Sequence, residues 1–263
     1  MKQVLTIAGS DSGGGAGIQA DLKTMTRFKV YGASVITAVT AQNTLGVQGV
    51  KALNGSFVAQ QLDSVVEDID FAAVKTGMLA NGEIINAVAD KIEEYHLSNL
   101  VVDPVLVATS GDLLLAQEAI STLKEQLIPR AKVITPNLDE AKVLTGRKKT
   151  EQVSLKQLVK ELHQFGADYV LVKGGHSRDE LARDLLYDGN DVIEFTAERI
   201  DTDDTHGTGC TLSAAIASNL ALGYGLAEAV KRSKDFITEA IRSGCQIGSG
   251  SNPVNHLIDY GEE

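Results

Sequence analysis

Short apolar runs alternate with longer segments of helical periodicity along almost the whole chain. Short, mainly apolar runs predict buried strands at residues 4–8, 35–41, 72–75, 100–102, 133–134 and 169–172. Helices are predicted over residues 18–28, 56–69, 84–95, 114–127, 138–144, 155–165, 210–222 and 227–242. This alternation is typical of an α/β fold, in which helices cover both faces of a mostly parallel central sheet.

One pair of segments departs from the alternation. Residues 184–187 and 192–195 flank the turn Asp188-Gly189-Asn190-Asp191, which predicts a small antiparallel hairpin. No linker rich in Pro, Gly or Ser divides the chain, and only 4 prolines are present. We therefore expect residues 1–263 to form a single domain, with residues 247–253 as a surface loop.

The chain carries 35 acidic and 24 basic side chains, which gives a formal net charge of −11. This charge argues against nucleic-acid binding, and an anionic substrate needs a local positive patch to bind at all. The 2 cysteines, Cys210 and Cys245, have no metal-ligand spacing, and we expect a reducing cytoplasm. No apolar stretch reaches about 18 residues without polar breaks, so no membrane span is expected.

Polar and small residues follow the predicted strands where each strand ends. In open α/β sheets ligands bind beyond the carboxyl ends of the strands, so these residues predict one composite site. They are Gly9, Asp11, Gln42, Asn43, Thr76, Gly77, Met78, Asp103, Val105, Asn137, Lys173 and Gly174.

The stretch from residue 203 to residue 213 joins a polar run to an apolar helix. Gly207 and Gly209, with Thr208 between them, let backbone N–H groups turn toward one point. The helix that follows adds its unpaired first-turn N–H groups and the positive end of its dipole, which together predict an anion site. Cys210 lies in that field, so its thiol is expected to ionise easily and to act as a base or nucleophile. The alternative is a Gly-rich helix start with a buried Cys.

Two further groups of residues are typical of phosphate and metal binding. Asn137 and Glu140 stand three apart at a helix start and could hold hydrated Mg²⁺ against phosphates, although capping of the helix explains them equally well. Lys173 could balance the charge of a nucleotide phosphate. Asp103 could orient a water bound to the metal.

Other residues could contact a flat organic substrate. The amide of Gln42 offers a donor and an acceptor to the edge of a heterocycle, and Met78 suits the face of a ring or ordinary packing. Asp21 could accept a hydrogen bond from a ligand, or be an exposed helical residue. The Gly-rich loop at 13–17 lacks the spacing of dinucleotide and P-loop motifs, which leaves a pocket wall or a plain turn. His206 is interpreted as a structural donor.

The motifs together resemble those of the hydroxymethylpyrimidine/phosphomethylpyrimidine kinases of the ribokinase-like superfamily. The resemblance runs in order over nearly the whole chain, at residues 8–23, 40–44, 75–78, 103–105, 135–138, 172–176 and 205–211. It implies an ATP-dependent kinase of thiamine biosynthesis that phosphorylates 4-amino-5-hydroxymethyl-2-methylpyrimidine and then its monophosphate.

The resemblance also implies roles for individual residues. Asn137, Glu140 and Lys173 would bind MgATP, and the backbone from Gly207 to Cys210 would bind the phosphoryl group during its transfer. Most ribokinase-like enzymes carry Asp where Cys210 stands, so the base here would be a thiolate. A homodimer is the family expectation. The pyrimidine pocket would be lined by Gly9, Asp21, Gln42, Met78 and Val105.

Two other functions stay open at this point. Pyridoxal/pyridoxine kinases share the fold and the Cys in place of Asp, although Gln42 favours the aminopyrimidine. A non-catalytic protein that binds a vitamin precursor is the second alternative, against which the presence of Lys173, Asn137, Glu140 and Cys210 argues. Some family members carry Lys where this chain has Thr109, which leaves the second phosphorylation less supported than the first.

Overall fold

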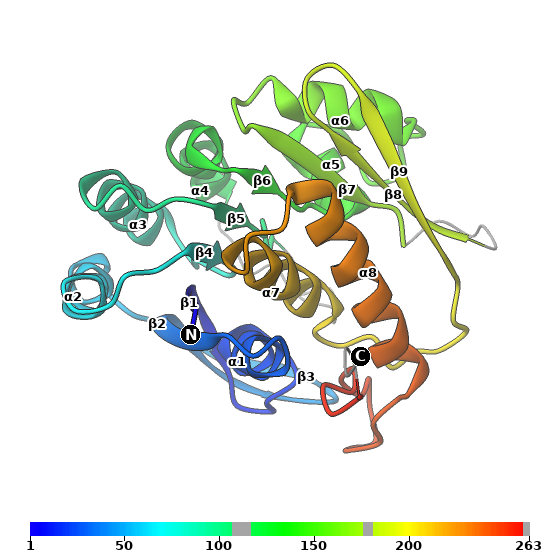
Figure 1. Cartoon of the computed structure of the whole chain (residues 1–263), viewed down its shortest axis with the longest axis horizontal. Helices are drawn as coiled ribbons and strands as arrows, with labels where there is room; N and C mark the ends of the chain where they lie inside the picture. The colour runs from blue at the N-terminus through cyan, green and yellow to red at the C-terminus, as the bar shows by residue number, and fades with distance from the viewer. Residues whose placement is uncertain (107–116, 176–180, 260–263) are drawn as a thin grey trace.

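The structure, a computed structural model, describes residues 1–106, 117–175 and 181–259. The described strands form one nine-stranded sheet of order β3-β2-β1-β4-β5-β6-β7-β8-β9 (Figure 1). Neighbours from β2 to β7 pair in parallel, whereas β3, β8 and β9 pair antiparallel at the two edges. The strands are β1 (Gln3–Asp11), β2 (Tyr31–Asn43), β3 (Gly46–Ala52), β4 (Ala73–Thr76), β5 (Leu100–Val102), β6 (Val133–Ile134), β7 (Tyr169–Lys173), β8 (Leu181–Tyr187) and β9 (Val192–Glu198).

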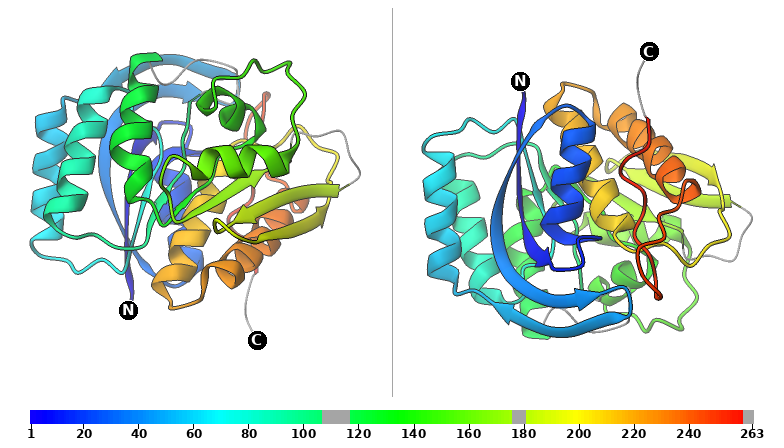
Figure 2. Two further views of the ribbon diagram at one scale, coloured as in Figure 1. Left: turned by 90° about the horizontal axis from the view of Figure 1, so that it is seen from above. Right: turned by 90° about the horizontal axis from the view of Figure 1, so that it is seen from below.

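Helices cover both faces of this sheet, as Figures 1 and 2 show. One apolar cluster, which includes Leu62, Ile85 and Leu158, lies between the sheet and α2 to α6. A second cluster, which includes Ile216 and Phe236, lies under α1, α7 and α8. The helices are α1 (Gly17–Arg27), α2 (Gly55–Val66), α3 (Gly82–Glu94), α4 (Gln117–Thr122), α5 (Leu138–Leu144), α6 (Leu155–His163), α7 (Thr208–Ala221) and α8 (Leu226–Arg242).

The predicted α/β architecture is confirmed, with two corrections at its edges. The sequence predicts a single antiparallel hairpin, but β2 and β3 form a second one. β3 was not predicted, because it is an edge strand whose side chains are exposed or half-buried. Such a strand has no apolar run in its sequence. The helix predicted over 114–127 continues past α4 as a π-helical turn, Leu123–Leu127, and its first residues lie outside the described part of the chain.

Helix α7 is apolar on nearly all sides and is buried from Thr211 to Ala221. Such a helix must pack on several partners at once, and α7 lies against β1, β4 and β5 as well as α1 and α8. This packing fixes its N-terminus at the carboxyl edge of the sheet. Among the described residues, no helix has both the length and the hydropathy to cross a membrane.

Candidate active site

A cavity of about 640 Å³ opens at the carboxyl ends of the parallel strands, beside the first turn of α7. Of the predicted site residues, Asp21, Asn43, Thr76, Gly77 and Gly174 do not line it, whereas the others do. The structure therefore brings these residues together, while the role of each stays a prediction. They are Gly9, Gln42, Met78, Asp103, Val105, Asn137, Glu140, Lys173, Gly207, Thr208, Gly209 and Cys210.

The turn before α7 has the backbone of an anion site. Gly207 is the N-cap, and its φ of 80° is a left-handed conformation that glycine adopts without strain. The N–H of Thr208 donates to the carbonyl of Thr205 at 3.2 Å, so it shapes the turn rather than serving a ligand. The N–H groups of Gly209 and Cys210 belong to the first helical turn, where donors have no partner within the helix. Both residues line the cavity at the N-terminal end of the helix, where its dipole is positive.

Two glycine-rich loops pack backbone against backbone beside this turn. A Cβ on Gly207 would lie 1.9 Å from the carbonyl oxygen of Gly15, so only glycine fits there. The carboxylate of Asp11 accepts N–H groups of the 13–16 loop at 2.8 to 3.0 Å, and it lies 3.0 Å from Nε2 of His206. Burial disfavours ionisation of Asp11, but the hydrogen bonds from His206 and the loop hold its pKa below the usual value. The 13–17 loop is thus a fixed wall of the cavity.

The segment at 247–255 ties these loops together from outside. Its Asn252 carbonyl accepts the N–H of His206 at 3.2 Å, and the Asn252 amide donates to Asp204 at 3.0 Å. The N–H of Gly250 donates to the hydroxyl of Thr44 at 3.2 Å. The surface loop predicted over 247–253 is therefore part of a strap, residues 247–255, that braces the anion loop, residues 204–210 at the start of α7.

The thiol of Cys210 is half-buried where it lines the cavity. Burial raises its pKa to about 11, and Asp21 and Asp103 add to the increase, while Lys75 and the N–H of Gly17 act in the opposite direction. The prediction that this thiol ionises more easily than a free one is therefore wrong. Desolvation of the thiolate outweighs the stabilisation by Lys75 and by the N–H of Gly17.

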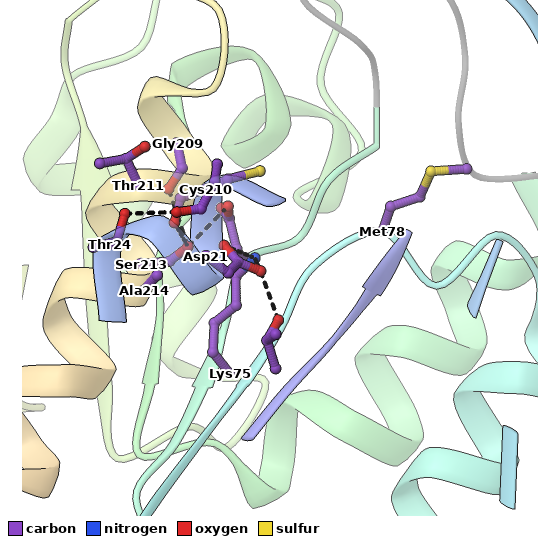
Figure 3. A network of polar contacts seen from close by, with 12 residues as sticks. Asp21, Thr24, Lys75, Met78, Gly209, Cys210, Thr211, Ser213 and Ala214 are labelled. Carbon is purple, nitrogen blue, oxygen red and sulfur yellow. Dashed lines mark hydrogen bonds and ion pairs between the residues drawn. The ribbon is translucent and has the colours of Figure 1, made fainter. Parts of the chain in front are cut away.

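Asp21 lies away from the cavity surface, in a fully buried ion pair (Figure 3). Its two carboxylate oxygens lie 3.0 and 2.9 Å from Nζ of Lys75, and the Thr6 hydroxyl donates to it at 2.6 Å. The prediction that Asp21 lines the pyrimidine pocket is at odds with this placement, because both oxygens are already bonded. It is not an exposed helical residue either. Sequence reasoning missed Lys75, because one lysine in a four-residue strand gives no periodic signal.

Buried Asp103 and half-buried Lys173 form a second ion pair, which reaches the anion loop. The ammonium of Lys173 donates to Asp103 at 3.1 Å, and Ser213 donates to the other carboxylate oxygen at 3.2 Å. A Cβ on Gly209 would lie 3.2 Å from Nζ of Lys173. Burial disfavours the charged ammonium, but Asp103 and Glu140 raise the pKa of Lys173 above its usual value. A positive charge therefore persists beside the anion loop at neutral pH.

Asn137 and Glu140 form a capping box at the start of α5, so the capping interpretation is confirmed. The side chain of Asn137 accepts from the N–H of Glu140 at 2.9 Å, and Glu140 accepts from the N–H of Asn137 at 2.8 Å. Both residues also line the cavity, so a cap and a ligand role are compatible. Burial and the charge of Asp103 raise the pKa of Glu140 to about 7, against the opposing effect of Lys173.

The carboxylate oxygens of Glu140 and Asp103 are suitable ligands for a hydrated Mg²⁺ ion. Glu140 and Asp103 are two carboxylates on one side of the cavity that repel each other electrostatically. No group of three or more His, Cys, Asp or Glu side chains suited to a metal occurs in the described part of the chain. Such a site suits Mg²⁺, which keeps several waters and takes one or two carboxylates together with phosphate oxygens.

The predicted pyrimidine end of the cavity has little space to spare. A Cβ on Gly9 would lie 3.2 Å from the sulfur of Met78, whose backbone carbonyl is held by the Thr37 hydroxyl at 2.6 Å. The amide of Gln42 accepts from the Thr40 hydroxyl at 3.2 Å. Gln42 is half-buried and lines the cavity, and its amide nitrogen lies 3.3 Å from Nε2 of His206.

The opposite end, formed by β8, β9 and α8, contains residues that sequence reasoning missed. Lys234 pairs with Asp184 at 2.6 Å, and both side chains are buried. A lysine in an amphipathic helix usually faces solvent, so no sequence signal distinguishes Lys234. Ile237 and Ile241 add an apolar surface suited to a base. Thr109 lies outside the described residues, as does residue 176 of the resemblance.

Comparisons with known proteins agree on one family. Residues 11–255 match the family model described as phosphomethylpyrimidine kinase. The chain is 49% identical over 256 residues to the hydroxymethylpyrimidine/phosphomethylpyrimidine kinase of Bacillus subtilis, covering 97% of this chain and 94% of the relative. It is 51% identical over 255 residues to a thiamine biosynthesis bifunctional protein of Geobacter sulfurreducens, covering 97% of this chain. It spans about half the length of that relative, namely 52%.

Solved structures are similar over most of the chain. A pyridoxal kinase of Bacillus subtilis in complex with ADP has a TM-score of 0.89 and 41% identity, with 97% of each chain covered. A phosphomethylpyrimidine kinase from Clostridium difficile has a TM-score of 0.80 and 48% identity, with 92% of this chain and 100% of that chain covered. These similarities confirm the predicted ribokinase-like fold.

Proposed function

Because the chain belongs to the phosphomethylpyrimidine kinase family, we propose that it phosphorylates 4-amino-5-hydroxymethyl-2-methylpyrimidine and then its monophosphate, with MgATP, in thiamine biosynthesis. One observation supports this most directly. Cys210 and the anion loop share one cavity with the Gln42 and Met78 end and with the Lys173 side chain. A hydroxyl acceptor and a triphosphate donor can therefore meet at the N-terminus of α7.

The residues divide the reaction between positioning and charge neutralisation, which is most of what phosphoryl transfer requires. The substrate hydroxyl oxygen attacks the terminal phosphorus of ATP, the bond from that phosphorus to the leaving oxygen of ADP breaks, and the hydroxyl proton passes to the sulfur of Cys210. The N–H groups of Gly209 and Cys210, with Lys173, stabilise the negative charge on the group in transfer. Mg²⁺ held by Glu140, and through water by Asp103, would neutralise the phosphates.

Cys210 accepts that proton only as a thiolate. A thiol whose pKa is about 11 is ionised in about one molecule in 10⁴ at pH 7. Groups that stabilise the thiolate therefore control how much of the enzyme is ready to react. A base of this kind contributes about 10²–10⁴-fold to the rate.

Assembly and location follow the family expectation. We propose a homodimer, which light scattering on a sizing column tests directly. A reducing cytoplasm is supported by Cys210 and Cys245, which are both free thiols.

The deciding experiment measures ATP consumption with the pyrimidine, its monophosphate, pyridoxal and ribose. We expect the highest kcat/KM for the two pyrimidines, since the amide of Gln42 can pair with an aminopyrimidine edge. Pyridoxal is the second candidate, because the pyridoxal kinase structure resembles this one closely. A preference for pyridoxal would overturn the proposal. Tight pyrimidine binding without ATP consumption would identify a non-catalytic binding protein instead.

A further inference from the structure

We propose that Lys75 is a positioning residue of the reaction, a buried cation that stabilises the thiolate of Cys210 from beneath the cavity. The proposal rests on the proposed function in one respect only, the role of Cys210 as the base. It assigns a task to a charged pair that the substrate does not touch.

The packing of three elements brings the Lys75 charge close to Cys210. Lys75 lies on β4, opposite Thr6 of β1, and α7 packs directly on β4. Figure 3 shows Lys75 and Asp21 beside the first turn of α7, with Cys210 next to them. A Cβ on Gly77 would lie 2.8 Å from Nζ of Lys75, so the ammonium sits against the backbone that leads to Met78 on the cavity wall.

The burial of this pair is hard to explain by stability alone. Lys75 and Asp21 have fully buried side chains, and taking two charges out of water costs more than a matched apolar pair would. Burial disfavours the ammonium, but Asp21 and Cys210 hold the pKa of Lys75 above its usual range.

Four charged groups act on the Cys210 sulfur, each from a different element. Lys75 on β4 stabilises the thiolate, whereas Asp21 on α1 and Asp103 after β5 destabilise it. Lys173 on β7 also interacts favourably with the thiolate. Among the charged groups the effect of Lys75 is the largest, and it exceeds that of Asp21. We therefore expect removal of the pair as a whole to make the thiolate harder to form.

The test measures alkylation of Cys210 by iodoacetamide as a function of pH, in the ligand-free protein. Cys245→Ser is the background, so that only one thiol reports. The double variant Lys75→Met/Asp21→Asn removes both charges and leaves no uncompensated ion in the core. We expect its alkylation near pH 8 to be about tenfold slower, which corresponds to a rise of one unit in the thiol pKa. We also expect a lower kcat with an unchanged KM for ATP.

The matched control is Lys234→Met/Asp184→Asn, which removes the other buried lysine–aspartate pair. This control should leave the alkylation profile of Cys210 nearly unchanged, because neither residue is among the main groups that shift the pKa of the thiol. If the Lys75 double variant folds cooperatively and keeps the parent profile, the proposal is overturned.

A second variant decides the matter if the double variant does not fold. Asp21→Asn alone leaves the Lys75 charge without its partner, so alkylation should become faster, and slower alkylation would contradict the proposal. Thiol reactivity needs neither ATP nor the pyrimidine. A failure of the substrate assignment would therefore leave this result intact, and the two failures can be told apart.

Discussion

Substitution of Gly207 by alanine is the most direct test of the anion loop, because the added methyl group should displace the loop backbone. The N-cap glycine of α7 has a φ of 80°, where alanine costs about 1–2 kcal/mol. The added Cβ would lie 1.9 Å from the carbonyl oxygen of Gly15, so one of the two loops must move by more than 1 Å. A displacement of that size, or the loss of one N–H donor, costs about 10²–10³-fold in turnover.

The assay compares Gly207→Ala with Gly223→Ala, at the opposite end of the same helix. Gly223 also has a positive φ, of 93°, but a Cβ there would meet nothing within 4 Å. Both variants should lose a similar 1–2 kcal/mol of stability from the backbone conformation, or about 2–8 °C in Tm. Only Gly207→Ala should also lose about 10²-fold in kcat. If both variants keep the parent kcat, the loop does not hold the group in transfer.

Three further predictions concern other parts of the site. Cys210→Ala should lower kcat by about 10²–10⁴-fold while calorimetry shows unchanged ATP binding, and a near-normal kcat would rule out the base. Gln42→Ala should raise the KM for the pyrimidine about tenfold or more, and an equal loss for ATP would indicate a folding defect instead. Burial raises the pKa of Glu140 to about 7 from 4.5, so between these two pH values the folded protein keeps a proton that the unfolded chain has lost. The free energy of unfolding therefore decreases as the pH rises from about 4.5 to about 7. Glu140→Gln removes this penalty and should gain up to about 3 kcal/mol over the parent between pH 4.5 and pH 8 in urea titrations; parallel titrations would contradict it.

Residues at strand ends were the most predictable part of the site. Gln42, Asp103 and Lys173 each stand directly after a predicted strand, and the carboxyl ends of parallel strands lie at one edge of the sheet. Gly207 and Cys210 were predictable for a similar reason, since a glycine turn before an apolar helix specifies where the N–H groups point.

Residues whose role depends on burial were the least predictable. Asp21 and Lys75 look like ordinary surface charges in sequence, and only the packing of α1 on β1 and of α7 on α1 and β4 removes both from water. The pKa of Cys210 was predicted with the wrong sign for the same reason. The helix field can be read from sequence, but desolvation follows from the neighbours that the fold supplies. Asp11 had a local signal, since an Asp directly before a glycine-rich loop often accepts its N–H groups.

The strap at 247–255 has a consequence for how activity is gained and lost. The Asp11–His206 and Thr44–Gly250 contacts join positions 195 and 206 residues apart, so each closes a very long loop of the chain. Contacts of such long range form late in folding, after the sheet that they brace. They are also few and only partly buried, so they open at a lower free energy than the core strands. The enzyme should therefore lose its activity at denaturant concentrations that leave its central sheet folded.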